Sequence, residues 1–229
     1  MLKLLLFIVT AICGLTAASQ PNYDKRNEVF SYQTHFKTPL GVNWQGPVIN
    51  ISKKVLSADK VPFIEHSAGN SSWLGMNFDY RYVKPVFEIL NSTKVPLINR
   101  GESHVTVISP PEFTVLATAG ITIEQVNKIA RDLKIQSSKV VIVCLGKEDV
   151  VVADLNKIVY QIIVKIPNLV KIRQKIFQLY IQQGGNSAFF DPRAFWPHIT
   201  VGFTSGDVFL DQGVYKGYNV CYRPISVKK

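Results

Sequence analysis

Histidine and acidic residues are sparse in this chain of 229 residues, which has four histidines and 16 Asp and Glu against 26 Lys and Arg. Carboxylates and histidines do not cluster at the spacing that metal ligands require, so we expect no metal and no other cofactor. The formal charge of +10 is spread along the chain without a long basic run. Such a charge is compatible with anionic ligands such as nucleotides, but on its own it is more typical of an ordinary basic protein.

Apolar runs long enough to span a membrane are missing after the first 19 residues, so we expect no association with a membrane. At the start of the chain, Lys3 precedes an apolar run at 4–9, and small residues follow at 16–19. This order is typical of a secretory signal peptide, and the apolar run is too short to favour a membrane anchor. We therefore predict a signal peptide at 1–19 and a secreted product.

Cysteine is also rare, with three residues, of which Cys13 lies in the predicted signal peptide. The other two, Cys144 and Cys221, lie in apolar, strand-like runs. An oxidising compartment favours a disulfide between them, whereas apolar surroundings are equally compatible with two separate buried thiols. The sequence leaves both alternatives open.

Three triplets of the form Asn-x-Ser/Thr begin at Asn50, Asn70 and Asn91. One such triplet is near chance expectation in a chain of this length, but three in close succession behind a signal peptide are more than chance predicts. We therefore predict N-glycosylation at all three asparagines, and an exposed N-terminal half of the protein.

The composition, 47% hydrophobic and 18% charged, predicts a folded chain. Residues 20–46 are polar with few periodic signals, and we interpret them as an extended N-terminal arm. We interpret residues 47–229 as the folded part, whose length suits one large domain or two small lobes. No short-period repeat is visible.

Hydrophobic periodicity predicts helices and strands in mixed order, which favours an α+β fold. Besides the two segments described below, strands are expected at 48–51, 73–80, 139–145, 158–164 and 218–222, with a turn at 146–149. Helices are expected at about 84–90, at 122–133 after a capping box, and from Pro167 to a glycine pair at 184–185. In the last helix, Ile172 and Ile176 form an apolar face, and Arg173 is expected elsewhere.

Two segments, 103–108 and 197–203, share one pattern: a histidine, an apolar residue, a threonine and a valine. In a strand, alternate side chains point to the same face. His104 and Thr106 then share one face, and His198 and Thr200 share another. Two imidazoles and two hydroxyls around one cavity suit a phosphate, because imidazoles serve as acid and base and hydroxyls donate hydrogen bonds.

These paired His-x-Thr segments, about ninety residues apart, resemble the two-histidine (2H) phosphoesterase superfamily. The second segment, with Trp196 and Pro197 before His198, is the more telling of the two. The preceding strand at 159–164, the helix from 169 to 177 and the glycine-rich loop are similar to that family's approach to its second histidine. The resemblance covers roughly residues 73–205 and points to the secreted fungal-type branch.

The resemblance implies a two-lobed, pseudo-symmetric α+β fold of antiparallel sheets with helices on the outside and a central cleft. It implies metal-free hydrolysis of cyclic phosphodiesters, commonly 2′,3′-cyclic phosphates at RNA ends or on nucleotides. His104 and His198 match the catalytic histidines, and Thr106 and Thr200 match the hydroxyls that contact phosphate. The sequence does not assign acid and base to the two histidines.

Trp196 falls on the face of His198 if the strand is regular, where it would be able to stack a base. Pro197 can disturb that register, and a tryptophan of the core or rim is the commoner outcome. Arg100 and Arg193 are within reach of a phosphate, but we interpret them first as surface residues.

The remaining two histidines, His35 and His66, lie in weak sequence context, and we predict both to be surface residues. Taken together, the patterns predict a secreted, metal-independent cyclic phosphodiesterase. Its substrates would be RNA ends or cyclic nucleotides, and we expect no stable protein partner. Two alternatives stay open: a secreted glycoprotein that binds nucleotide or RNA without turnover, and a ribonuclease that cleaves chains by transphosphorylation.

Overall fold

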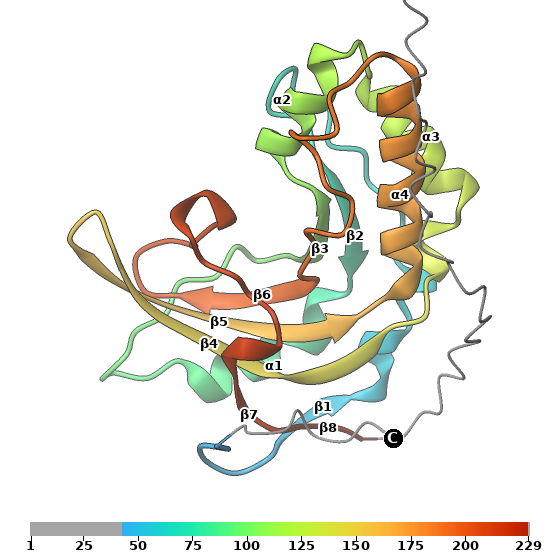
Figure 1. Cartoon of the computed structure of the whole chain (residues 1–229). Coiled ribbons are helices and arrows are strands. Elements are labelled where there is room, and N and C mark those ends of the chain that lie inside the picture. The colour runs from blue at the N-terminus through green and yellow to red at the C-terminus, as the bar shows by residue number, and fades with distance from the viewer. Residues whose placement is uncertain (1–42, 229) are drawn as a thin grey trace, which may run out of the picture. The chain divides into compact units, whose positions relative to one another are not determined.

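Three β-sheets organise residues 43–228, the part of the chain that this computed structural model describes; these residues lie in one unit, Phe36–Lys229. The strands are β1 (Ile49–Ser52), β2 (Leu74–Phe78), β3 (Ser103–Ile108), β4 (Val141–Val152), β5 (Leu155–Lys165), β6 (His198–Phe203), β7 (Cys221–Arg223) and β8 (Ile225–Lys228). Strands β2 and β3 form one sheet, β1 and β8 a second, and β6-β5-β4-β7 a third (Figure 1). All pairs are antiparallel except β1–β8, which is parallel.

The α-helices begin where the sequence provides start signals. They are α1 (Tyr80–Leu90), α2 (Pro110–Thr118), α3 (Ile123–Asp132) and α4 (Pro167–Gln182). Capping boxes begin α2, at Ser109, and α3, at Thr122, and so satisfy backbone N–H groups that have no partner within the helix. Helix α4 contacts both α3 and β3, so α4 lies between α3 and the sheet formed by β2 and β3 (Figure 1).

Strands β4 and β5 form a long hairpin that projects beyond the rest of the third sheet (Figure 1). Its turn is at Ala153 and Asp154, both with positive φ, as a tight two-residue hairpin turn requires. The turn expected at 146–149 is therefore wrong. Gly146 is a strand residue that pairs with Gln161, and a Cβ atom at this position would lie 2.8 Å from Val220. Glycine is needed there for close packing, and the polar residues after it continue the strand.

A single large core cluster takes apolar side chains from all four α-helices and from strands of each sheet. A smaller cluster surrounds Cys144 and Cys221, which form a disulfide between β4 and β7 with a Cα–Cα distance of 5.7 Å. The disulfide is the first of the two alternatives left open by the sequence. It closes a loop of 77 residues and so restricts the unfolded chain.

The antiparallel sheets and mixed helices confirm the α+β class. Strands occur at or near the expected positions, except that residues 218–220 form a short 3-10 helix before β7. Helix α1 is longer than expected, and it contains Pro85. The sheets are unequal in strand number, and the two-lobed pseudo-symmetry implied by the resemblance is not demonstrated by them. The predicted signal peptide at 1–19 and the predicted arm up to residue 42 lie outside the described residues.

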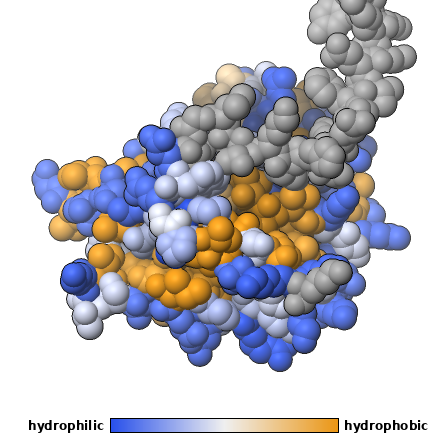
Figure 2. All heavy atoms as spheres, turned by 90° about the horizontal axis from the view of Figure 1, so that it is seen from below, coloured by the Kyte–Doolittle hydropathy of each residue, from blue (hydrophilic) through white to orange (hydrophobic). Residues whose placement is uncertain are grey.

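The surface carries apolar side chains among polar ones. Figure 2 views the molecule from the bottom of Figure 1, where β1 and β8 lie, and shows apolar side chains gathered on this face. Much of the surface of any folded protein is apolar, and we assign no function to this face. Among residues 43–228, no helix has both the length and the apolar character needed to cross a bilayer.

Candidate active site

Strands β3 and β6 carry the two His-x-Thr patterns with the alternation expected from the sequence. Val105 and Val107 of β3 are buried, whereas His104 and Thr106 are partly accessible. In β6, Ile199 and Val201 are buried, and His198 and Thr200 are partly accessible. The buried residues belong to the core cluster, so core packing fixes which face of each strand presents its imidazole and hydroxyl.

The two strands lie against each other although they belong to different sheets. Just before β3, Ile98 forms an antiparallel bridge with Phe203 at the end of β6, with N···O distances of 2.8 and 3.0 Å in the two directions. Beside this bridge is a small open pocket, lined by Asn99, Arg100, Glu102, His104, Thr200, Val201, Gly202 and Phe203. The pocket therefore takes its lining from both strands. His198 and Thr106 are not part of this lining.

His104 lies in a largely buried environment between an aromatic ring and a carboxylate. The centroid of its ring is 4.6 Å from that of Trp73, and its Nδ1 atom is 3.6 Å from Glu102 Oε1. Burial lowers the pKa of His104, and Glu102 acts in the opposite direction. Strand β6, which carries His198, contacts β3, and the charge of a protonated His104 acts to lower the pKa of His198.

His198 is held by the backbone of the residue two positions before it. Its Nδ1 atom lies 2.7 Å from the carbonyl oxygen of Trp196. Because a carbonyl only accepts, Nδ1 carries the proton, and Nε2 of the neutral ring is left with a free lone pair. Burial, reinforced by the positive charge of Lys216, lowers the pKa of His198 to about 4. At neutral pH this histidine is therefore a neutral imidazole, with its one proton on Nδ1.

Beside Thr200, Asp207 and Lys216 form a buried ion pair, which the more exposed Arg100 joins. The Asp207 carboxylate accepts hydrogen bonds from Thr200 Oγ1 at 3.3 Å, from Lys216 Nζ at 2.5 Å and from Arg100 Nη2 at 3.2 Å. Burial acts to raise the pKa of Asp207, but Lys216 outweighs this and lowers it. The carboxylate is thus ionised, and it holds two cations beside the pocket.

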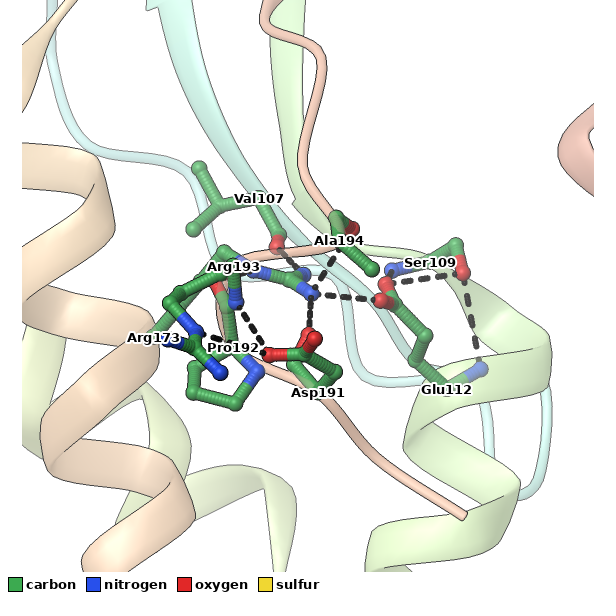
Figure 3. Close-up of polar contacts among 8 residues, drawn as sticks. All are labelled: Val107, Ser109, Glu112, Arg173, Asp191, Pro192, Arg193 and Ala194. Atoms are coloured by element: carbon green, nitrogen blue, oxygen red, sulfur yellow. Dashed lines mark hydrogen bonds and ion pairs between the residues drawn. The ribbon is translucent and has the colours of Figure 1, made fainter. Parts of the chain in front are cut away.

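Arg173 of α4 connects the regions that flank both His-x-Thr strands (Figure 3). Its guanidinium donates to Val107 O at 2.7 Å and to Glu112 Oε1 at 2.8 Å. Further bonds reach the carbonyls of Asp191, Pro192 and Ala194 in the loop before β6. The side chain is 1% exposed, which corrects its expected place off the buried face of the helix. One planar group with five donors therefore fixes β3, α2 and this loop together.

Trp196 precedes β6 and is partly buried, and its ring packs edge-on against Tyr215 with centroids 5.0 Å apart. Asn50, Asn70 and Asn91 are all exposed, in keeping with the predicted glycosylation, which stays a prediction. Arg193 is exposed at the surface, as expected.

Arg100 is 40% exposed, as expected for a surface residue, and it also lines the pocket and pairs with Asp207. His66 is only partly accessible and stacks on Trp73, so it is less exposed than expected. His35 lies outside the described residues. Arg100 has a weak local signal, since it lies four residues before His104. His66, Asp207 and Lys216 have none, because their positions depend on contacts between distant segments.

Within residues 43–228, no group of three or more His, Cys, Asp or Glu side chains is arranged to hold a metal ion. The chemistry that the described residues supply is that of two imidazoles, two threonine hydroxyls and an arginine. Such a set transfers protons and binds an anion.

Comparisons with known proteins agree with this arrangement. The family model described as "Swiss Army Knife, 2H phosphoesterase domain" matches residues 72–209, which contain both His-x-Thr strands, Arg173 and Asp207. No curated protein and no solved structure matches the chain. The match covers more than half of the chain, and the protein therefore belongs to the 2H phosphoesterase superfamily, whose activity is phosphoester hydrolysis.

Proposed function

We propose that this protein is a cyclic phosphodiesterase that opens 2′,3′-cyclic phosphates at RNA ends or on nucleotides without a metal ion. The proposal depends mainly on one observation: β3 and β6, which carry His104 and His198, contact each other although the two histidines are 94 positions apart in the sequence. Each strand has its threonine on the same face as its histidine. In-line displacement at phosphorus needs one group that accepts a proton from water and one that gives a proton to the leaving oxygen.

His198 is the better general base. The hydrogen bond from Nδ1 to the Trp196 carbonyl leaves Nε2 as an acceptor, and its low pKa keeps that atom unprotonated. His104 is the better general acid, because Glu102 lies beside it and favours its protonated form. A bound cyclic phosphate adds a negative charge between the two rings and favours protonation of His104 further.

The proposed reaction is an attack of water on the phosphorus of the cyclic phosphate. His198 Nε2 takes a proton from water while the water oxygen bonds to phosphorus. The bond from phosphorus to one ribose oxygen breaks, and His104 gives its proton to that oxygen. The product is a phosphomonoester with a free neighbouring hydroxyl, and the two histidines exchange their protons through solvent before the next cycle.

Charge on the non-bridging phosphate oxygens grows in the transition state and needs hydrogen-bond donors. We assign Thr106 and Thr200 to this task, together with Arg100, which lines the pocket and can keep one N–H on Asp207 while others face the ligand. Trp196, beside Tyr215 and next to the histidine strand, is the side chain that we propose stacks on a base.

We further propose that the enzyme acts outside the cell, as a glycoprotein modified at Asn50, Asn70 and Asn91 after loss of residues 1–19. The proposal rests on the sequence patterns and on the exposure of the three asparagines. Secretion is tested by mass spectrometry of protein recovered from culture medium, where an N-terminus still at Met1 would contradict it.

The direct test of the activity is an assay of purified protein on 2′,3′-cyclic nucleotides and on RNA with a cyclic phosphate end, with EDTA present. We expect phosphomonoester products, and we expect His104→Gln and His198→Gln each to reduce turnover by about 10²- to 10⁴-fold. Loss of activity in EDTA would contradict the metal-free mechanism. Binding without turnover would establish the first alternative, and cyclic phosphate as a product from intact RNA would establish the ribonuclease.

A further inference from the structure

Trp73 and His66 form a stacked pair next to the active site. Their ring centroids are 3.6 Å apart and the ring planes are inclined by 16°. The backbone supports the stack, because the two residues form an antiparallel bridge in which Trp73 N–H donates to His66 O at 3.1 Å. Burial lowers the pKa of His66, so a neutral imidazole covers the indole at neutral pH.

The same indole also contacts His104, with ring centroids 4.6 Å apart and an inclination of 48°. Trp73 therefore lies between a histidine of unknown purpose and a histidine of the active site. Gly75 makes this possible, since a Cβ atom there would lie 2.6 Å from the indole. Gly75 pairs with Thr106 of β3, so the indole crosses the β2–β3 pair on the face that carries His104 and Thr106.

His104 has a particular need for such support. Its Nδ1 atom is buried and, among the described residues, has no hydrogen-bond partner; Glu102 Oε1 is 3.6 Å away. His198, by contrast, is fixed by a 2.7 Å hydrogen bond. The orientation of the His104 ring is therefore set by packing, and Trp73 is the aromatic ring that contacts it.

We propose that Trp73, backed by His66, is a positioning residue that holds the His104 imidazole at the angle required for proton transfer. This inference rests on the proposed function of His104. It assigns a role to a third histidine that neither donates nor accepts a proton in the reaction. Among the charged groups, Glu102 favours protonation of both His66 and His104, Arg100 disfavours protonation of His104, and Asp207 favours it.

Steady-state kinetics on a 2′,3′-cyclic nucleotide tests the role of the stack. We expect Trp73→Leu to lower kcat by about 10- to 100-fold with KM changed less than about threefold, because misplacing a catalytic group slows the chemical step. His66→Ala should lower kcat by a smaller factor, and His66→Phe should restore it, since a flat ring is what the stack needs. The matched control is Trp44→Phe, because Trp44 packs near the disulfide instead.

NMR of the histidine rings gives a readout that does not depend on activity. In the native protein we expect the carbon-bound ring protons of His66 and His104 to be shifted by the indole, and Trp73→Phe to alter both shifts while those of His198 stay unchanged. Folded Trp73→Leu protein with native kcat would overturn the inference, as would His66→Phe with the same loss as His66→Ala. If Trp73→Leu does not fold, the kinetics of His66→Ala and His66→Phe and the ring-proton shifts of Trp73→Phe decide the question.

The two hypotheses fail in different ways. A native enzyme that hydrolyses no cyclic phosphate overturns the proposed function, and with it the role of the stack. An active native enzyme whose kcat is indifferent to Trp73 and His66 overturns only the positioning role.

Discussion

Strands β3 and β6 repeat one short pattern in two different surroundings. His104 on β3 lies against an indole and has no hydrogen bond at Nδ1 within the described residues. His198 on β6 is held by a carbonyl, and the charges of the buried pair Lys216 and Asp207 act on it. Thr200 is likewise bonded to Asp207, whose carboxylate also holds Lys216.

The difference shows that equal patterns need not have equal chemistry. Each His-x-Thr segment determines which face of its strand presents an imidazole. The surroundings, drawn from other parts of the chain, determine the tautomer, the pKa and the rigidity of that imidazole. We therefore assign unlike roles to the two histidines although their sequence contexts are alike.

The pH dependence of kcat/KM should distinguish the roles of the two histidines most clearly. Below about pH 4, His198 becomes protonated and no longer accepts a proton, so activity falls. Above the pKa of His104, which is lowered from 6.5, the acid loses its proton and activity falls again. We expect a bell-shaped profile with its maximum between the pKa of His198 and the pKa of His104.

Single variants assign the two limbs of that profile. Alongside their loss of about 10²- to 10⁴-fold in rate, His198→Gln should remove the acidic limb and His104→Gln the alkaline limb. The measurement is kcat/KM across the acidic and neutral range with protein shown to be folded by circular dichroism. Loss of the same limb in both variants would contradict unlike roles.

Arg173 is the feature that the two strands share, so its replacement should affect both. Arg173→Met leaves Glu112 and several carbonyls without their donor, and we expect it to lower the free energy of unfolding by about 3–5 kcal/mol. Arg173→Lys should recover only part of this, because an ammonium has three donors in place of five. Urea unfolding measures both.

The control for this change is Arg193→Met, since Arg193 is exposed. We expect the control to alter the unfolding free energy by less than about 0.5 kcal/mol. Equal stability of Arg173→Met and the native protein would show that the clamp in Figure 3 does not hold the strands in place.

The threonines should show the smallest and most informative difference. Thr106→Val and Thr200→Val each remove one hydrogen bond to the charged phosphate, which we expect to lower kcat/KM by about 10- to 100-fold. Thr200→Val should in addition lower stability by about 1 kcal/mol, because Asp207 loses a donor. Kinetics and thermal unfolding of both variants measure this, and equal stabilities would argue that the bond to Asp207 contributes little.

Regular periodicity made the strand faces predictable. The alternation in β3 and β6 follows from apolar residues at every second position, and the start of α3 follows from Thr122 and Gln125. Both signals are local, so a single sequence is enough to find them. The same alternation singled out the two histidines and two threonines of the candidate site, whose catalytic role stays a prediction.

Contacts between distant segments explain what the sequence did not show. Arg173 is spaced like a surface residue of an amphipathic helix, and its burial is favourable because distant groups accept its hydrogen bonds: Val107 O, Glu112 and the carbonyls of the loop before β6. His66 reaches the site through Trp73, and Asp207 reaches Thr200 through the fold of the loop that follows β6. The polar run after Gly146 indicated a turn because its strand partners were not known.

The bridge between Ile98 and Phe203 is the place where backbone hydrogen bonds link the two histidine-bearing regions, and within residues 43–228 no ladder joins β3 to β6 themselves. Paired strands are confined to a separation of about 4.8 Å, but strands that meet through side chains are not. We therefore expect the distance between the two imidazoles to depend on the volume of the buried core residues beside them in sequence, such as Val105 and Ile199. Exchanges of single methyl groups there offer a way to suit the enzyme to bulkier or slimmer leaving groups while every reacting side chain stays the same.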